Sequence, residues 1–330
     1  MLGAITGRIT ISPTDHQSAM TPAFPPIASS PGTFDAHSQV FANLRAPDGP
    51  RLAVCLREGI LDVTAAAQSL RLTVPRHTDA LLSGGPAQLD DCMAAAFSAG
   101  PEPWLLTESQ ALFAPAVTRP GKIVCVGLNY RQHARETGMG EPKAPPLFTK
   151  YNNALTHHGA TVPTAGLPGN HFDYECELVI VIGKHCRNVS ESAALDHVFG
   201  YCTGNDFSER NSQLNTTQWL AGKSSDGFAP LGPYLVGAAL VGNPNALAIE
   251  TRVNGELRQS SNTADFIFNC QYLIAYISRL FPLEPSDIIF TGTPEGVVLG
   301  MPLDQQKWLR PGDTVVTTVE KIGSLQITVG

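Results

Sequence analysis

The sequence has no apolar run that approaches the roughly 18 residues of a membrane-spanning helix. Its first 35 residues have neither a basic start nor a continuous apolar stretch, which argues against a secretory signal. They are rich in Ser, Thr, Pro and Ala, and we interpret residues 1–35 as a loosely ordered N-terminal extension. An organelle-targeting segment and an over-extended start are the alternatives. We therefore predict a soluble protein with a cytoplasmic location and no membrane partner.

Patterned cysteines and clustered basic residues are also missing. The seven cysteines contain no C-x-x-C pair, which argues against a disulfide framework or a zinc site and indicates reduced thiols. The formal net charge is -7, and no run of Lys and Arg is interleaved with aromatic residues. Because such a chain offers no positive field to phosphate backbones, we expect no nucleic-acid partner.

The chain is long enough for two domains, since it has 330 residues of which 43% are hydrophobic. Pro and Gly in TRPGK, at 118–122, predict a boundary between a small N-terminal domain at 36–117 and a catalytic domain at 118–330. In the second domain, strand-like runs such as ELVIVIG and TVVTTVE outnumber the candidate helices at 131–138, 190–198 and 269–280. Without a regular alternation of strands and helices, this pattern favours a β-rich α+β fold over a doubly wound sheet.

Two acids, Glu175 and Glu177, stand two residues apart in the strand-like run DYECELVIVIG, and Asp206 follows in GNDFSER. Alternate strand residues share a face, so the two glutamates lie side by side, Cys176 faces the core, and Asp173 stays open as a further candidate ligand. Buried carboxylates without partners would cost several kcal/mol each, and an oxygen-ligated Mg²⁺ or Mn²⁺ removes that cost. The other interpretation is a solvated strand face, which a lone Glu-x-Glu often is.

Three further features admit a functional and an ordinary interpretation. His133 and Glu136 share a face of a short predicted helix. They are either a base with its orienting carboxylate or an exposed surface pair, and spacing alone favours the surface pair. Lys223, in AGKSSDG, can stabilise an enolate oxygen or be a surface lysine. The loop TGTPEG at 291–296 can bind a substrate carboxylate or be a tight turn.

Seven segments in order carry a family resemblance: KIVCVGLNYRQHARE, PPLFTK, GYCTGNDFSERNSQ, WLAGKSSDGFAPLGPYLV, VNGELRQ, IIFTGTPEGV and LRPGDTV. Together they resemble the fumarylacetoacetate hydrolase family over roughly two thirds of the chain, and several motifs in order are far more specific than one. The resemblance implies a rolled, barrel-like mixed β-sheet and a homodimer.

The resemblance also implies roles for individual residues. The metal ligands that it implies, for Mg²⁺ or Mn²⁺, are Glu175, Glu177 and Asp206. The catalytic residues that it implies, a water-activating pair and an enolate-stabilising lysine, are His133, Glu136 and Lys223. The substrate-binding residues that it implies are Thr293, Gly292, Gln213, Tyr130 and Arg131.

Two positions depart from the family pattern. Lys150-Tyr151-Asn152-Asn153 replaces a Lys-Pro-Ser segment that borders the substrate pocket in relatives, which leaves the distal specificity open. Asn211 replaces a frequent aspartate beside Arg210, which weakens the expectation that Arg210 is ion-paired in the usual way, and we interpret Arg210 as structural.

These residues predict hydrolytic cleavage of a carbon-carbon bond in a 2,4-dioxo acid, which gives pyruvate or a substituted pyruvate and a second acid. The alternatives within the family are decarboxylation, isomerisation, hydration or lyase reactions of small 2-oxo acids such as oxaloacetate or 2-oxo-alkenedioates. An alternative from another class is a catalytically silent metal-binding homologue.

Overall fold

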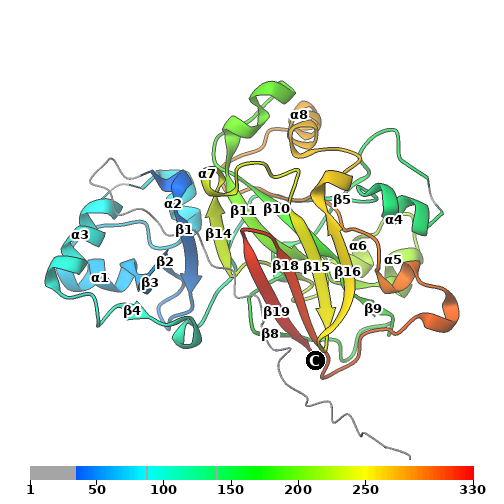
Figure 1. Ribbon diagram of the computed structural model, residues 1–330, viewed down its shortest axis with the longest axis horizontal. Helices are drawn as coiled ribbons and strands as arrows, with labels where there is room; N and C mark the ends of the chain where they lie inside the picture. The colour runs from blue at the N-terminus through cyan, green and yellow to red at the C-terminus, as the bar shows by residue number, and fades with distance from the viewer. Residues whose placement is uncertain (1–34, 87, 139) are drawn as a thin grey trace, which may run out of the picture.

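A ten-stranded mixed sheet runs through the computed structural model, which describes residues 35–86, 88–138 and 140–330 (Figure 1). The predicted extension at 1–35 lies outside the described residues except for Asp35. The strand order is β4-β3-β2-β1-β14-β11-β10-β17-β5-β6, and within it β17 and β5 are parallel. The strands are β1 (Val40–Leu44), β2 (Arg51–Leu56), β3 (Gly59–Asp62), β4 (Leu105–Leu106), β5 (Ile123–Val126), β6 (Leu147–Thr149), β10 (Cys176–Ile182), β11 (Val198–Asn205), β14 (Tyr234–Gly237) and β17 (Ile288–Phe290).

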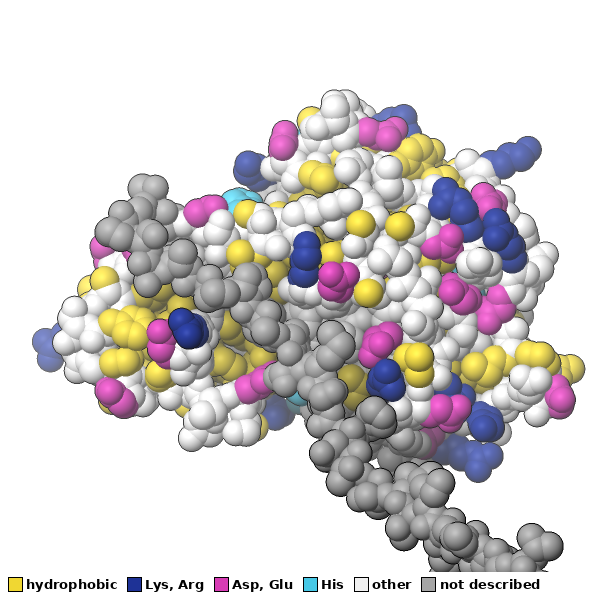
Figure 2. All heavy atoms as spheres, in the orientation of Figure 1, with side chains coloured by type: hydrophobic (Ala, Val, Ile, Leu, Met, Phe, Trp, Pro, Cys, Tyr) yellow, Lys and Arg dark blue, Asp and Glu magenta, His cyan; other side chains and the backbone are white. Residues whose placement is uncertain are grey.

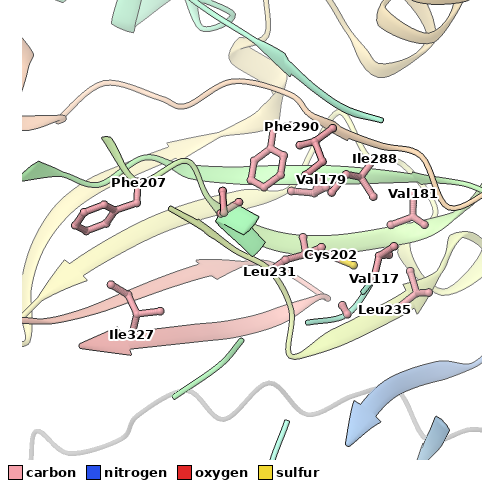
Figure 3. Close-up of a cluster of buried hydrophobic side chains, with 14 of the residues drawn as sticks. Val117, Val179, Val181, Cys202, Phe207, Leu231, Leu235, Ile288, Phe290 and Ile327 are labelled. Carbon is pink, nitrogen blue, oxygen red and sulfur yellow. The ribbon is translucent and has the colours of Figure 1, made fainter. Parts of the chain in front are cut away.

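A second sheet of five strands, in the order β16-β15-β18-β19-β8, packs across β10 and β11. Its strands are β8 (Ala160–Val162), β15 (Ala248–Val253), β16 (Glu256–Asn262), β18 (Thr314–Val319) and β19 (Gly323–Val329). Figure 3 shows Val179 and Val181 of β10 and Cys202 of β11 in a cluster of buried side chains that also includes Ile327 of β19. Because β10 is covered on both faces, its whole length is buried, and the continuous apolar run LVIVI suits that position.

Short elements complete the fold. Two small sheets pair β9 (Phe172–Asp173) with β12 (Ser208–Glu209) and β7 (Leu155–Thr156) with β13 (Ala229–Pro230). The α-helices are α1 (Val63–Leu70), α2 (Thr78–Gly84), α3 (Leu89–Ala99), α4 (Arg131–Glu136), α5 (Arg210–Leu214), α6 (Leu220–Lys223), α7 (Ala238–Val241) and α8 (Cys270–Leu280). The 3-10 helices are η1 (Ala36–Ser38), η2 (Glu108–Gln110), η3 (Asn152–Ala154), η4 (Glu191–His197), η5 (Thr263–Asp265), η6 (Val298–Gly300) and η7 (Leu303–Gln305).

The N-terminal strands extend the main sheet, because β1 pairs antiparallel with β14. The side chain of Asp79 in α2 also ties this part to the following segment, since it accepts N–H bonds from Thr118 and Arg119 at 3.0 and 2.8 Å. In Figure 1 the helices α1 to α3 lie with β1 to β4 at one end of the molecule. The division into domains at 36–117 and 118–330 stays a prediction.

The β-rich α+β fold predicted from the sequence is confirmed. Within the described residues, neither large sheet closes on itself, so the expected barrel-like form is a pair of packed open sheets. The candidate helix at 190–198 is a 3-10 helix, and the strand-like run YLVGAALVG ends as a strand at Gly237 and continues as α7. At 269–280 the helix α8 begins after Asn269, whose side chain accepts from the N–H of Tyr272.

The described part of the chain contains no helix that is both long and apolar enough to cross a membrane. Figure 2 shows side chains of both charge signs interspersed over one face of the molecule. That face therefore presents no extended field of one sign.

Candidate active site

Three buried carboxylates meet where β10 begins and β11 ends. The two strands are antiparallel with Cys176 opposite Asn205, so Glu175 and Glu177 come beside Asp206. A backbone hydrogen bond also joins the two segments, since the N–H of Asp206 donates to the carbonyl of Glu175 over 2.9 Å. One oxygen of each of the three carboxylates lies within 4.8 Å of the others. Cys176 lies in the hydrophobic core, as strand alternation predicts.

Three buried cationic side chains hold this carboxylate cluster, which we define as Glu175, Glu177 and Asp206. Lys223 Nζ lies 2.7 Å from Glu175 Oε2 and 2.8 Å from Asp206 Oδ2. Lys150 Nζ lies 2.5 Å from Asp206 Oδ1, and Arg210 Nη1 lies 2.7 Å from Glu175 Oε1. Since buried charges are tolerated only when they are paired, these contacts fix the positions of Glu175 and Asp206.

Glu175 and Glu177 differ in their electrostatic surroundings. Burial raises the pKa of Glu177 well above its usual range, and the nearby negative charges of Asp206 and Glu175 raise it further. The N–H of Gly292 donates a hydrogen bond to Glu177 Oε2 over 2.7 Å, and this bond acts to lower the pKa of Glu177. Burial also acts to raise the pKa of Glu175, but Lys223 and Arg210 outweigh it and lower that pKa to about 2. The cluster is thus short of positive charge at Glu177.

The cluster fits a hard divalent cation. Its donors are all carboxylate oxygens, the ligands that Mg²⁺ and Mn²⁺ prefer. A cation beside Glu177 would favour the charged form of that carboxylate. If a metal ion binds here, Glu175, Glu177 and Asp206 would hold it, and the cations paired with two of them would keep those carboxylates in place.

Arg210 connects the carboxylate cluster to the loop that follows β17. Besides Glu175, its guanidinium contacts Asp173, with Nε and Nη2 at 2.9 and 2.8 Å from Oδ2. The Asp173 carboxylate also accepts N–H bonds from Val298 and Leu299, at 2.9 and 3.1 Å. One buried ion pair therefore links a carboxylate of the cluster to the backbone of η6.

This link corrects two expectations from the sequence. Arg210 does have a buried ion pair, but its partner is Asp173 in a distant segment and not the neighbouring position 211. Asp173, which strand alternation left open as a ligand, is engaged by Arg210 and η6 instead. The alternation does not extend that far, because β9 ends at Asp173 and β10 begins only at Cys176.

Lys150 is a site residue that the sequence reasoning did not single out. Its Nζ donates to the backbone carbonyls of Lys223, Phe228 and Phe207 at 2.5, 2.8 and 3.1 Å, in addition to its contact with Asp206. Burial lowers the pKa of Lys150, and Asp206 acts to raise it. A lone lysine that directly follows the strand-like run PPLFT is the sequence signal that could have found it.

His133 and Glu136 face each other on α4. Because a carboxylate only accepts, Nδ1 of His133 donates to Glu136 Oε2, over 3.2 Å. The N–H of Gly296 donates to both oxygens of Glu136, at 3.1 and 3.2 Å. Gly300 lies against the same carboxylate, since a Cβ there would be 2.4 Å from Glu136 Cδ. The pair is therefore braced by a loop, unlike an ordinary exposed pair on a helix surface, and Nε2 is the ring nitrogen left for a ligand.

One cavity joins these groups. Glu175, Glu177, Lys223 and His133 all line it. Thr293 and Gln213, both predicted to bind substrate, line it too.

The predicted substrate-binding residues differ in their contacts. Thr293 Oγ1 accepts a hydrogen bond from Gln259 Nε2 at 2.9 Å, and Gln213 Oε1 accepts one from Arg210 Nη1 at 2.9 Å. The N–H of Gly292 donates to Glu177, so this residue positions the carboxylate cluster.

Tyr130 and Arg131 lie away from the described lining of the cavity. Tyr130 is fully buried, with its ring centroid 4.8 Å from that of Phe266. Arg131 donates to the backbone carbonyls of Asp265 and Phe266. Burial raises the pKa of Tyr130 well above its usual range, and the charge of Glu177 raises it further, so this phenol lies near the carboxylate cluster. The substrate-binding role of both residues stays a prediction.

Comparisons with known proteins agree with this geometry. Residues 122–330 match the family described as "Fumarylacetoacetate (FAA) hydrolase C-terminal". The chain is 38% identical over 269 residues to "Oxaloacetate tautomerase FAHD2B, mitochondrial" of Bos taurus, a match that covers 80% of this chain and 82% of the relative. It is 43% identical over 222 residues to "Oxaloacetate tautomerase YisK" of Bacillus subtilis, with 66% and 73% covered.

Solved structures show the same relationship. A fumarylacetoacetate hydrolase from Exiguobacterium antarcticum superposes with a TM-score of 0.74 and 30% identity, over 88% of this chain and 99% of that chain. A fumarylpyruvate hydrolase from Pseudomonas aeruginosa, in complex with Mn²⁺ and pyruvate, gives a TM-score of 0.58 and 33% identity over 64% and 90% of the two chains. The chain belongs to the fumarylacetoacetate hydrolase family.

Proposed function

We propose that this protein is a divalent-metal-dependent tautomerase that interconverts the keto and enol forms of a 2-oxo acid, with oxaloacetate as the first substrate to test. The observation that carries the proposal is that His133 and Lys223 line one cavity beside the carboxylate cluster. Enolisation needs a base for a carbon-bound proton and positive charge beside the forming oxyanion, and these two side chains can supply them. The tautomerase names of the bovine and Bacillus relatives support this reaction.

In the direction from keto to enol, Nε2 of His133 takes a proton from C3 of the substrate. The electron pair of the broken C3–H bond forms the C2–C3 double bond, and the π pair of the C2 carbonyl moves onto its oxygen. That oxygen finally takes a proton from solvent, and the imidazolium returns its proton to solvent. Lys223 stabilises the negative charge on that oxygen, while Glu136 orients the imidazole and stabilises its protonated form. A divalent ion held by Glu175, Glu177 and Asp206 would supply a Lewis acid for the carboxylate and 2-oxo group.

The test follows the ultraviolet absorbance of enol oxaloacetate after it is added to the enzyme with Mg²⁺ or Mn²⁺. The absorbance should decay faster than in buffer, and chelation should return the decay to the buffer rate. Lys223→Ala should slow the enzymatic reaction strongly, whereas Lys122→Ala is the matched control, because Lys122 pairs with Asp287 outside the cavity lining. A wild-type rate equal to that of buffer would contradict the proposal.

Hydrolysis of a 2,4-dioxo acid, the reaction predicted first from the sequence, is the second candidate. It is favoured by the braced His133–Glu136 pair, which can also activate a water molecule. Release of pyruvate from acetylpyruvate would show it, and Glu136→Gln should slow that release roughly 100-fold, by the usual size of general-base contributions. Decarboxylation of oxaloacetate needs no activated water, so it should fall much less. Unchanged acetylpyruvate cleavage in Glu136→Gln would exclude the hydrolytic role of the pair.

The homodimer and the cytoplasmic location stay predictions of the sequence. A small 2-oxo acid is the substrate class that we propose for either reaction. Absence of turnover with every such acid would instead favour the silent homologue.

A further inference from the structure

The cavity has two unlike sides. One side is charged and consists of the carboxylate cluster with Lys223 and Arg210. The other side is an apolar wall, which we define as Leu128, Phe148, Leu214, Trp219 and Leu299. A 2-oxo acid that places its carboxylate and 2-oxo group on the charged side would direct its remaining substituent to this wall.

The rings of Phe148 and Trp219 place the apolar wall next to the charged side of the cavity. Phe148 and Trp219 form an edge-to-face pair, with ring centroids 5.3 Å apart and planes at 70°. Lys223 Nζ lies 5.2 Å from the centroid of the Phe148 ring. Gly127 leaves room for the indole ring of Trp219, because a Cβ at that position would be 2.4 Å from Trp219 Cζ3. The apolar wall therefore begins directly beside the lysine that we assign to the forming oxyanion.

A second carboxylate on the substrate would find little positive charge at this wall. Among the described residues that line the cavity, the cationic or ionisable basic side chains are His133, Arg210 and Lys223. Arg210 is bound by Asp173 and Glu175, and Lys223 by Glu175 and Asp206. Because burying a carboxylate without a partner is costly and burying an aryl ring is favourable, the wall selects for an apolar group.

We propose that the preferred substrates are 2-oxo acids with an aryl group on C3, such as phenylpyruvate, and that the enzyme interconverts their keto and enol forms. This inference rests on the proposed function. Nε2 of His133 takes the proton from C3, the electron pair of the broken C3–H bond forms the C2–C3 double bond, and the π pair of the C2 carbonyl moves onto its oxygen. That oxygen then takes a proton from solvent, and the imidazolium returns its proton to solvent. The reaction needs no oxidant, reductant or second substrate. The aryl ring packs against Phe148 and Trp219, where edge-to-face contacts add to the gain from burial.

The experiment compares kcat/KM for ketonisation of enol phenylpyruvate and enol oxaloacetate by the metal-loaded enzyme. Phenylpyruvate should be the better substrate, and Trp219→Ala should shift the ratio of the two values toward oxaloacetate by at least about 10-fold, the size expected from a lost apolar contact. Trp308→Ala is the matched control, because this tryptophan stacks on His171 outside the cavity lining and should leave the ratio as in wild type.

If Trp219→Ala folds poorly, a binding measurement tests the same inference. Phenylpyruvate should quench tryptophan fluorescence of the wild-type enzyme, and the quenching should largely disappear in Trp219→Phe, which keeps an aromatic ring. Fast oxaloacetate turnover with phenylpyruvate 100-fold slower, or an unchanged ratio in Trp219→Ala, would overturn the inference and leave the proposed function standing. If neither acid is turned over, the proposed function fails and the fluorescence decides: absence of quenching overturns the apolar site, and quenching lost in Trp219→Phe supports it.

Discussion

The carboxylate cluster and the His133–Glu136 pair line the same cavity, but they are held in different ways. The cluster lies at the ends of two central strands, with buried cations bound to Glu175 and Asp206. The pair lies on the six-residue helix α4 and depends on one N–H group of the loop after β17, with the Glu136 side chain 22% exposed. Buried ion pairs resist displacement, whereas a partly exposed pair on a short helix shifts at lower cost. Metal binding and proton transfer should therefore be separable by mutation.

The largest effect is expected at the centre of the cluster. Asp206→Ala should abolish both turnover and binding of Mn²⁺, because it removes one ligand and leaves Lys150 and Lys223 short of a buried counter-charge. Breaking a buried ion pair costs about 3–5 kcal/mol, so the melting temperature should also fall. Asp206→Asn keeps the shape and isolates the loss of the ligand. Calorimetric titration with Mn²⁺ measures the outcome, and wild-type affinity in Asp206→Asn would refute the ligand assignment.

A change in the pair should affect turnover alone. His133→Gln should lower turnover by about 100- to 10,000-fold, the usual contribution of a general base, and leave the affinity for Mn²⁺ as in wild type. Turnover at saturating Mn²⁺ and the same calorimetric titration separate the two quantities. A parallel loss of metal affinity would show that the two groups are not separable.

Asp173 connects the carboxylate cluster to the loop that holds the His133–Glu136 pair, so its replacement should affect both metal binding and turnover. Asp173→Asn weakens the contact with Arg210 and the N–H bonds from Val298 and Leu299, so Mn²⁺ affinity should fall about 10- to 100-fold, as for other residues that support ligands. Turnover at saturating Mn²⁺ should fall as well, because the same loop holds Glu136.

Asp287→Asn is the matched control for Asp173→Asn. Asp287 is equally buried, and it binds Lys122 and the N–H of Glu284. It should lower stability without changing the affinity for Mn²⁺. An equal loss of affinity in both variants would attribute the effect to general destabilisation.

The smallest effect on turnover is expected for Asp79, a carboxylate that serves the fold alone. Burial acts to raise its pKa, but hydrogen bonds from His77, Thr118 and Arg119 outweigh it and lower the pKa from 3.8 to about 2. A lowered carboxyl pKa stabilises the folded state above the unfolded value of 3.8, and this gain disappears as the pH falls toward 2. Asp79→Asn should therefore cost about 2 kcal/mol at pH 7.

Denaturant unfolding of wild type and Asp79→Asn over a pH series measures this difference. The two proteins should converge as the pH falls from about 4 to 2, because the wild-type carboxylate becomes protonated there. Turnover of the variant at pH 7 should match that of wild type. A stability difference that is independent of pH would show that the charge of Asp79 does not matter.

Local rules predicted which residues lie side by side but not what they do. The spacing of Glu175 and Glu177 predicts a shared strand face and that of His133 and Glu136 a shared helix face, whereas only the family resemblance assigned either pair to a site. The contact of Arg210 with Asp173 could not be predicted, because it depends on how two separate segments pack. Tyr130, beside the helix, illustrates the same limit, since tertiary packing against Phe266 decides where its ring lies.

The pairing of β1 with β14 also matters for how the chain avoids self-association. β14 lies between β1 and β11, so each of its sides is covered by a neighbouring strand. A truncated chain that begins after residue 117 would leave β14 as an unpaired edge, with the apolar side chains Leu235 and Val236 in it. Exposed edges of this kind recruit strands from other molecules. The N-terminal part thus covers an edge at which the central sheet could otherwise be extended by another chain.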